Sequence, residues 1–369
     1  MARRRVPAHL AQDRHRRQAR RLSQARMEMT AGNMVADHVL RCGPGTVVWG
    51  FLGPDVPPAL RIRPGDTVRI DTVNAVGVPL PPDEALAFFT HHGLPLEGPV
   101  AEMLEIMRTV PKDVGPHILT GPVSVEGAEP GDVLAVEILA VAPREPAYGV
   151  NFARPGAGAL PGLLKEPRLK LMRHDVAGGV ARFDERIAIP LAPFMGTMGV
   201  APTRKVSSIP PGPFGGNLDL KDLRPGAVLY LPVQVAGADF FVGDGHAAQG
   251  HGEVNLTGLE TSMTGVFRFA LHKARGLRWP MAETDEHYIA MGLDEDLDAA
   301  AELAVLQAVA VLRHFGELPD ADAYALASLA VDFEITQLVD GVKGVHGRIP
   351  KRLLAACPRA TGRRWGPLP

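Results

Sequence analysis

The sequence has little of several features that identify a class of protein at once. Only two cysteines, Cys42 and Cys357, occur in 369 residues. They are too few for a disulfide framework, and we therefore expect a reduced, cytoplasmic protein. No apolar run approaches the ~18 residues that a membrane-spanning helix requires. The formal net charge is only -2, so the overall balance calls for no nucleic-acid partner. We accordingly predict neither a membrane nor a nucleic acid among its partners.

Basic charge gathers only at the N-terminus. Residues 1–26 hold nine arginines and a single acidic residue, Asp13. They lack the apolar segment of a secretory signal, although a targeting segment or a nucleic-acid-binding arm is an alternative interpretation. We expect residues 1–35 to form a basic, disordered tail outside the folded unit.

Glycine and proline, in contrast, are abundant, with 40 and 34 residues respectively. Three Pro-Gly turns, in the segments that begin at residues 63, 129 and 224, each precede a run rich in β-branched residues. Such turns and runs are typical of short strands. We therefore predict a β-rich unit over residues 36–275. Within it, residues 145–215 are rich in glycine and proline but interleaved with apolar side chains, which indicates loops packed over a site.

The last hundred residues change character. Residues 294–316 show a helical apolar stripe that ends at a glycine, residues 318–333 read as a second helix, and residues 333–339 read as a strand. We therefore predict an α+β part over residues 276–369, packed on the β unit. The expected fold class is α+β, mainly β.

The segment GDGHAAQGHGEV, residues 243–254, concentrates the most chemistry. Asp244 and His246 are two residues apart, as are His251 and Glu253, and residues two apart share one face of an extended chain. If the four-residue spacer between the pairs reverses the chain, all four side chains converge. Carboxylate oxygens and imidazole nitrogens together suit zinc or another divalent transition metal. An ordinary polar surface hairpin is the alternative interpretation.

The chain also resembles the acetamidase/formamidase family, which hydrolyses short aliphatic amides to the acid and ammonia. The matching phrases run in the family's order from about residue 45 to residue 354. They are PPALRIRPGDTVRIDTV, HILTGPVSVEGAEPGD, FMGTMGVAP, IPPGPFGGNLDLKDL, YLPV with GDGHAAQGHGEV, TDEHYIAMG and AYALASLAVDFEITQLVDGVKGVHGRIP. The resemblance implies a mostly β fold with a jelly-roll-like part and a small barrel. It also implies metal dependence and a homodimer or higher homo-oligomer.

An amide hydrolase needs a nucleophile, a base and a stabilised oxyanion. The sequence has no GxSxG elbow and no cysteine in a nucleophilic setting, so a metal-activated water is the economical nucleophile. The expected metal ligands are Asp244, His246, His117, His251 and Asp219. Glu253 is the expected general base, with Glu126 as a second catalytic candidate, and Asn217 and Gln249 are expected to bind the substrate. We expect zinc as the metal and a small aliphatic amide as the substrate.

The chain departs from the family pattern at several of these places. His251 stands where the family usually has Asp, Val48 where it often has His, Ile118 where Pro is usual, and Asp340 where Asn is usual. A metal-dependent lyase or isomerase on the same scaffold is therefore an alternative function. A non-catalytic small-molecule-binding protein is another, and the change at position 251 is the feature that favours it.

Overall fold

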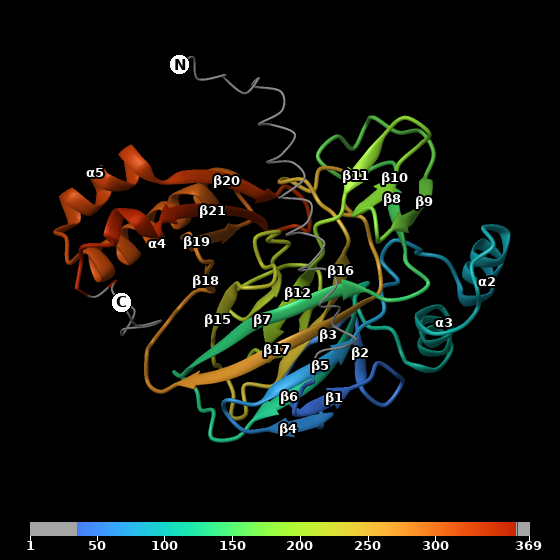
Figure 1. Cartoon of the computed structure of the whole chain (residues 1–369), viewed down its shortest axis with the longest axis horizontal. Helices are drawn as coiled ribbons and strands as arrows, with labels where there is room; N and C mark the ends of the chain where they lie inside the picture. The colour runs from blue at the N-terminus through green and yellow to red at the C-terminus, as the bar shows by residue number, and fades with distance from the viewer. Residues whose placement is uncertain (1–34, 359, 361–369) are drawn as a thin grey trace, which may run out of the picture.

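The computed structural model describes residues 35–358 and residue 360 (Figure 1). Apart from Val35, the tail predicted over residues 1–35 lies outside the described residues. The three Pro-Gly turns are confirmed, because Gly65, Gly131 and Gly226 have φ angles of 103°, 93° and 95°. Each turn leads directly into a strand. Glycine occupies this left-handed region without the steric cost that a side chain would bring.

The largest sheet has nine strands in the order β1-β5-β17-β7-β15-β18-β19-β21-β20. β1 and β5 run parallel, and the remaining neighbours are antiparallel. The strands are β1 (His38–Leu40), β5 (Thr67–Asp71), β17 (Met263–His272), β7 (Val133–Pro143), β15 (Val228–Pro232), β18 (Met281–Glu283), β19 (His287–Asp294), β21 (Lys343–Pro350) and β20 (Asp332–Gln337). The strands of the C-terminal part thus extend the sheet of the β unit.

A second sheet has the order β14-β12-β16-β6-β2, with β4 also paired to β6. Its strands are β14 (Gly215–Asn217), β12 (Phe194–Val200), β16 (Phe240–His246), β6 (Ile118–Val125), β2 (Val47–Trp49) and β4 (Leu60–Ile62). Every residue of β6, β12 and β16 is buried. These three strands are therefore covered on both faces, which makes β16 a rigid support for any side chain it carries.

The two large sheets pack on each other through an aromatic contact. The ring of Phe240 on β16 lies 6.2 Å from that of Phe267 and 5.3 Å from that of Phe269, both on β17. Edge-to-face pairs at such distances are favourable. None of the sheets formed by the described residues closes on itself, so the predicted barrel and jelly-roll detail is not confirmed. The mostly β architecture is.

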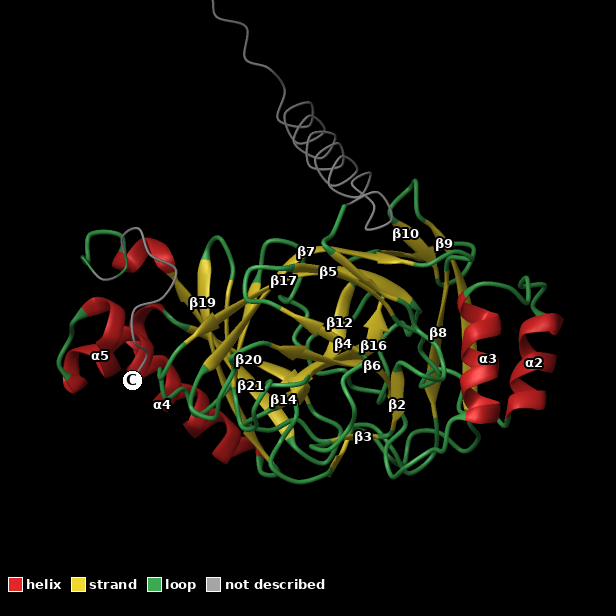
Figure 2. Ribbon diagram, turned by 90° about the horizontal axis from the view of Figure 1, so that it is seen from below, coloured by secondary structure: helices red, strands yellow, loops and turns green. Residues whose placement is uncertain are grey.

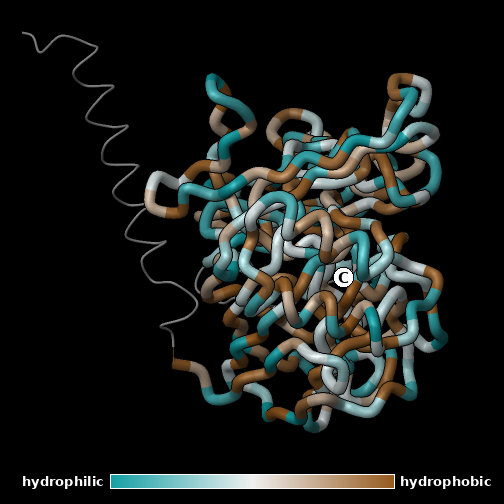
Figure 3. The backbone as a smooth tube through the Cα atoms, turned by 90° about the vertical axis from the view of Figure 1, so that its right-hand side faces the viewer, coloured by the Kyte–Doolittle hydropathy of each residue, from teal (hydrophilic) through white to brown (hydrophobic). Residues whose placement is uncertain are grey.

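Two small sheets complete the β structure. One contains β8 (Tyr148–Ala153), β9 (Arg168–Asp175), β10 (Val180–Arg182) and β11 (Ala188–Pro190), and the other pairs β3 (Phe51–Leu52) with β13 (Val206–Ser207). Residues 145–215 are therefore partly strand and not wholly irregular. Along the chain, hydrophobic and hydrophilic stretches alternate over short distances (Figure 3), as the turn-rich sequence predicts.

The helices lie at the two ends of the molecule (Figure 2). They are α2 (Pro82–His91), α3 (Pro99–Thr109), α4 (Leu297–Gly316), α5 (Asp320–Ala330) and the 3₁₀ helix η1 (Lys351–Leu354). The side chain of Asp296 caps α4 by accepting hydrogen bonds from the amides of Asp298 and Ala299. The two helices and the strand predicted near the C-terminus are confirmed as α4, α5 and β20.

Helix α4 also meets the length and composition criteria of a membrane span, the one helix among the described residues to do so. It packs against β19 and β21, and Ala300, Ala304 and Ala308 are fully buried there. The core helix of a globular protein meets the same criteria, so this finding is weak evidence for a membrane segment.

Candidate active site

Strand β16 delivers two chemical groups to one cavity. Asp244 and His246 lie at the end of β16, both line the cavity, and they are 3% and 1% exposed. Gly196 on the neighbouring strand β12 makes room for them. A Cβ atom at Gly196 would lie 2.6 Å from Oδ1 of Asp219 and 2.7 Å from Oδ2 of Asp244. The close approach of these two carboxylates therefore requires a glycine at position 196.

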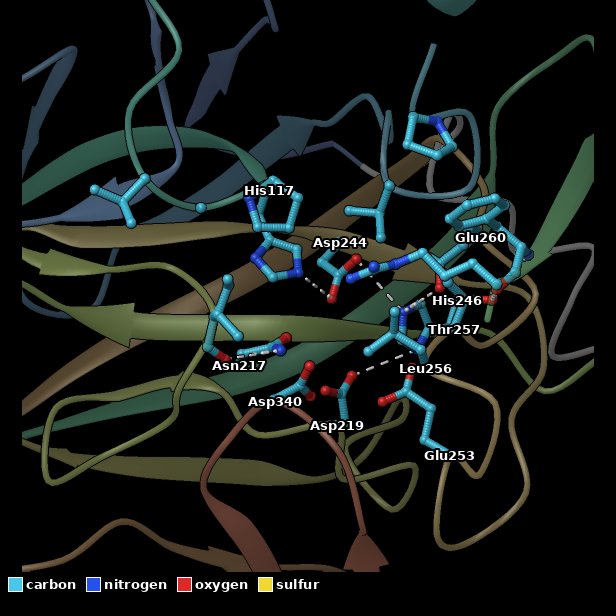
Figure 4. A pocket seen from close by; sticks show the side chains of 18 of the residues that line it. His117, Asn217, Asp219, Asp244, His246, Glu253, Leu256, Thr257, Glu260 and Asp340 are labelled. Carbon is cyan, nitrogen blue, oxygen red and sulfur yellow. Dashed lines mark hydrogen bonds and ion pairs between the residues drawn. The ribbon is translucent and has the colours of Figure 1, made fainter. Parts of the chain in front are cut away.

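The cavity has a volume of about 270 Å³. Figure 4 shows that its polar side chains come from segments far apart in the sequence and point toward one another. The polar lining includes His117, Asn217, Asp219, Asp244, His246, Glu253, Glu260 and Asp340. The apolar lining includes Val76, Pro79, Phe152, Ile209 and Leu256. A small space with a polar floor and an apolar wall suits a small polar molecule with an alkyl end.

His246 is at the centre of the polar cluster. Its Nε2 lies 3.2 Å from Oε1 of Glu260 and 3.5 Å from Oδ1 of Asp244. Its Nδ1 lies 2.6 Å from Oε1 of Gln249 and 3.6 Å from Oδ1 of Asp219. The amide of Gln249 is oriented by its Nε2, which donates to the backbone oxygen of Asp219 at 3.0 Å. With that orientation Nδ1 of His246 is a donor, and Nε2 is the nitrogen that faces Asp244 and Glu260.

His117 approaches Asp244 from the other side. Its Nε2 lies 3.6 Å from Oδ2 of Asp244, and its Nδ1 lies 2.9 Å from the hydroxyl of Ser208. His117 directly precedes β6 and is 4% exposed. Both imidazoles are therefore held in place by a polar partner on the ring nitrogen opposite Asp244.

Three further polar side chains form hydrogen bonds at the site. Nδ2 of Asn74 donates to Oε2 of Glu260 at 2.6 Å and to Oδ1 of Asp244 at 3.3 Å. The hydroxyl of Thr197 donates to Oδ1 of Asn217 at 2.9 Å. Nδ2 of Asn217 in turn donates to the backbone oxygen of Ile209 at 3.1 Å. One hydrogen of the Asn217 amide group is thereby used, and the other is available at the cavity.

The cavity contains more carboxyl groups than imidazoles, and most of these carboxyl groups have raised pKa values. Burial raises the pKa of Asp219 to about 7, against the effect of His246. Burial, and next the charge of Asp219, raise the pKa of Glu253 and that of Asp340 well above their ordinary values. Burial also raises the pKa of Glu260. These carboxyls need either protons or a cation to balance them.

The pKa values of Asp244 and His246 shift in the directions that favour an ion pair between them. Burial acts to raise the pKa of Asp244, but His117 and His246 outweigh it and hold that pKa below its ordinary value. Burial acts to lower the pKa of His246, but Glu260 and Asp244 outweigh it and raise that pKa well above the ordinary range. Burial lowers the pKa of His117. Without a cation, His246 thus carries a second proton, as an imidazolium, which offsets part of the negative charge of the site.

The donor set fits a divalent metal ion. One nitrogen or oxygen atom from each of Asp244, His246 and Glu260 lies within 4.8 Å of the others, and the same holds for Asp219, His246 and Glu253. Oε1 of Glu260 and Oδ1 of Asp219 are buried and have no hydrogen-bond partner among the described residues. Buried oxygens without a partner are costly, and a cation would satisfy them.

Backbone geometry sets these carboxylates apart as well. Asp219, Asp244, Glu253 and Asp340 have φ angles of 48°, 55°, 41° and 64°. Non-glycine residues adopt this left-handed region at a cost of about 1–3 kcal/mol, and such strain concentrates at functional sites. The four carboxylates are therefore held by the surrounding fold in positions that their local sequence disfavours.

The structure brings together most of the predicted site residues but not all of them. His117, Asn217, Asp219, Asp244, His246 and Glu253 line the cavity. Gln249 is not among the lining residues, and its Oε1 contacts Nδ1 of His246, a position that favours a role in orienting the imidazole over the predicted contact with substrate. Glu126 lies on an exposed turn, 3.7 Å from Nε of Arg63, with a side chain that is 61% exposed. Its predicted catalytic role is not supported by this position.

The predicted return strand after the spacer is also wrong. His246 pairs with Glu260, and the amide of Thr261 donates to Gly245 at 2.7 Å, so the returning segment comes nine residues later than expected. Left-handed φ angles of 98° at Gly252 and 41° at Glu253 break the alternation between His251 and Glu253. His251 therefore points away from the cavity, and Nε2 of His251 lies 2.6 Å from Oε2 of Glu334 on β20.

Sequence reasoning missed three members of the site. Glu260 and Asn74 sit in segments without a metal-like spacing, and nothing in the local pattern distinguishes them. Asp340 was noted as a departure from the family but was assigned no role. It lies in the turn between β20 and β21 and lines the cavity.

Comparison with known proteins supports the resemblance seen in the sequence. The family model described as the acetamidase/formamidase family matches residues 107–208 and 203–351. Because these matches cover more than half of the chain, the protein belongs to the acetamidase/formamidase family. The prediction that the chain is a member of an amidohydrolase family is confirmed.

Individual relatives agree with this assignment. A formamidase of Methylophilus methylotrophus is 24% identical over 361 residues, which cover 78% of this chain and 84% of the relative. An acetamidase of Mycolicibacterium smegmatis is 26% identical, over 56% of this chain and 61% of the relative. A relative from Schizosaccharomyces pombe is 27% identical, and this chain spans 59% of its length.

Solved structures share the fold. An acetamidase from Bacillus halodurans, known from its crystal structure, is 30% identical in sequence to this chain, with a TM-score of 0.72. The superposition covers 86% of this chain and 100% of the acetamidase. An acetamidase/formamidase structure from Thermoanaerobacter tengcongensis has a TM-score of 0.73 at 27% identity and covers 87% of this chain and 97% of its own.

Proposed function

We propose that the protein is a metal-dependent hydrolase that cleaves a small aliphatic amide, such as formamide or acetamide, to the carboxylate and ammonia. The observation that carries this proposal is the cavity of about 270 Å³ in which His246 meets Asp244, Glu260 and Asp219. Pockets for drug-sized ligands usually measure about 300–1,000 Å³, so this one suits a substrate of a few heavy atoms. The names of the relatives point to the same substrate class.

Asp244, His246 and Glu260 are the residues best placed to hold the ion. Since Nδ1 of His246 is engaged by Gln249, Nε2 is the nitrogen left for coordination, and Asp244 and Glu260 are the carboxylates beside it. His117 can add a second imidazole from the far side of Asp244. The mixture of imidazole and carboxylate ligands leads us to propose zinc. When bound, a divalent ion of this kind supplies Lewis-acid chemistry, which activates water and polarises a carbonyl oxygen.

Glu253 and Asp219 are proposed to move protons. Both carboxyls line the cavity, and Oδ1 of Asp219 lies 3.6 Å from Nδ1 of His246, the nitrogen that is not available for coordination. Glu253 accepts a proton from the attacking water, and that proton then passes to the nitrogen that leaves as ammonia. The pKa of about 7 for Asp219 suits a group that holds and releases a proton near neutrality.

Asn217 and the apolar wall are proposed to orient the amide. Thr197 and Ile209 fix the Asn217 side chain, which leaves one N–H to donate to a substrate oxygen. Phe152 and Leu256 lie on the apolar side of the cavity and would contact the alkyl end. Such a wall distinguishes homologous substrates by only about 1–3 kcal/mol per methylene.

The position of His251 weakens the non-catalytic alternative. That alternative rested on the exchange of Asp for His at position 251, and His251 does not line the cavity. The proposal further includes a reduced cytoplasmic location, in keeping with the free cysteines Cys42 and Cys357, and a homo-oligomeric assembly, as the resemblance implies.

The direct test is ammonia release from formamide, acetamide and propionamide by protein whose metal content has been measured. We expect turnover with at least one of them, its loss on chelation, and its return with added zinc. Folded, zinc-loaded protein that releases no ammonia from any of the three would contradict the proposal. Conversion of the amide without ammonia release would favour a lyase or isomerase.

A further inference from the structure

A second cluster of metal-type ligands lies outside the cavity. Donor atoms of Asp222, His251 and His346 lie within 4.8 Å of one another. Glu334 joins them, because its Oε2 lies 2.6 Å from Nε2 of His251 and 3.8 Å from Nε2 of His346. Oδ2 of Asp222 lies 3.8 Å from the same nitrogen of His346. None of these four residues lines the cavity described above.

Several of these donor atoms are buried and unsatisfied. His346 is fully buried, and its Nε2 has no hydrogen-bond partner among the described residues. Oδ2 of Asp222 and Nδ1 of His251 are also buried atoms without a hydrogen bond among these residues, and Oε2 of Glu334 has only its ion-pair contacts with the two imidazoles. Native structures rarely leave so many buried polar atoms together without a partner, unless an ion or a water belongs there. The unsatisfied atoms of Asp222, Glu334 and His346 lie within 3.8 Å of one another in pairs that share Nε2 of His346.

The surrounding groups orient these donors as they do in metal sites. The hydroxyl of Thr336 lies 2.7 Å from Nδ1 of His346, which fixes the ring with Nε2 facing the cluster. Arg348 contacts only the outer oxygens of the two carboxylates, at 3.7 Å from Oδ1 of Asp222 and 3.6 Å from Oε1 of Glu334. The inner oxygens therefore face the imidazoles. Partners of this kind hold metal ligands in position.

We propose that Asp222, His251, His346 and Glu334 form a second divalent-metal site, suited to zinc. Two imidazole nitrogens and two carboxylate oxygens are an ordinary ligand set for four-coordinate zinc. Metal–ligand distances of about 2.0–2.1 Å place tetrahedral donors roughly 3.3 Å apart. The His251–Glu334 separation of 2.6 Å and the separations of 3.8 Å from His346 to Asp222 and to Glu334 lie on either side of that spacing.

The ion would tie the active-site loops to the C-terminal strands. Asp222 follows Asp219 by three residues, and His251 precedes Glu253 by two. The ligands on the opposite side, Glu334 and His346, lie on β20 and β21, which are neighbours at one edge of the large sheet (Figure 1). Backbone hydrogen bonds from Gly252 to Thr336 and from Leu338 to Gly252, both 2.9 Å, already align these segments. The second site is therefore structural, with an effect on the placement of Asp219 and Glu253.

Elemental analysis of the full-length chain tests this proposal independently of amide hydrolysis. Protein incubated with zinc and freed of excess should hold two equivalents. His251→Ala and Asp222→Asn should each lose one equivalent, and Asp244→Asn should lose the other. His91→Ala is the matched control, since it removes an exposed imidazole from α2, and it should hold as much zinc as the wild type. His251→Asp, which restores an oxygen ligand, should recover the lost equivalent.

The outcomes separate the two sites. If the cavity binds no ion, the wild type should hold one equivalent that His251→Ala removes and Asp244→Asn does not, which supports the second site while contradicting the proposed function. If His251→Ala and Asp222→Asn fold and keep the full zinc content of the wild type, the second site is overturned. Thermal unfolding gives a second readout. Zinc should raise the midpoint of chelated wild-type protein more than that of either variant, and equal shifts would also overturn the proposal.

Discussion

Oε1 of Gln249 lies 2.6 Å from Nδ1 of His246, and this contact sets which nitrogen of the central imidazole can bind a metal. The Gln249 amide is itself held by the backbone of Asp219. A glutamine in a glycine-rich loop thus acts on the site through a histidine three residues earlier.

We predict that Gln249→Ala weakens metal binding at the cavity. Loss of the hydrogen-bond partner frees the ring of His246 and its tautomer, and such changes usually reduce metal affinity by about 10–100-fold. Zinc affinity, measured by competition with a chromophoric chelator, should fall in that range with folding intact. Gln249→Glu retains an acceptor at this position and should weaken binding less. Equal losses in both variants would speak against a positioning role.

We predict that Glu253→Gln lowers turnover by about 10²–10⁴-fold while metal content is preserved. This is the usual contribution of a general acid or base, and the substitution keeps the shape of the side chain. Single-turnover ammonia release would measure it.

Glu126→Gln is the matched control for this variant, because Glu126 is exposed and lies against Arg63. Unchanged turnover is expected there. Loss of metal from Glu253→Gln would make Glu253 a ligand, and loss of turnover from Glu126→Gln would return that residue to the site.

Some residues of this site could be predicted from the sequence, and others could not, because they reach the cavity in different ways. Asp244 and His246 could be paired correctly because a single strand, β16, carries both into the cavity, although Asp244 itself has a left-handed φ. His251 and Glu253 could not, since the left-handed backbone at Gly252 and Glu253 cancels the period of a strand. Gln249 was expected to bind substrate, whereas its contact with His246 favours a positioning role.

Residues that arrive from other segments were harder to predict. Glu260 reaches His246 through an antiparallel bridge, and Asn74 reaches Glu260 from the chain that follows β5. Both depend on how strands pair, which local spacing does not encode. The helices α4 and α5, in contrast, depend on a local apolar period, which Asp296 supports by capping α4, and they were predicted within a few residues. Asp320, expected near the N-cap of α5, is its first residue and does not cap it.

We predict that Asp340→Asn moves the acidic limb of the pH–rate profile to lower pH. Burial, then Asp219, and also Asp340 raise the pKa of Glu253. Activity requires Glu253 in its ionised form, so kcat/KM should fall as the pH drops through that pKa. Removing the charge at position 340 lowers the pKa of Glu253, and activity should then persist to a lower pH. The profile of kcat/KM from about pH 5 to pH 9 measures this shift, and a shift to higher pH would contradict it.

Finally, we predict that Gly196→Ala damages the site more than it damages the fold. The new methyl group would stand 2.6 Å from Oδ1 of Asp219 and 2.7 Å from Oδ2 of Asp244, so both carboxylates must move. Overpacking of this kind typically costs about 1–3 kcal/mol of stability, which a domain of this size can tolerate. A displacement of about 1 Å in a reacting group can cost roughly 10²-fold in rate.

Gly162→Ala, at a position with nothing within 4 Å, is the control. We expect Gly196→Ala to remain folded by circular dichroism but to lose at least about 10²-fold in turnover, together with part of its zinc, whereas Gly162→Ala should retain both. Full activity in Gly196→Ala would show that the two carboxylates need not lie as close as the structure places them.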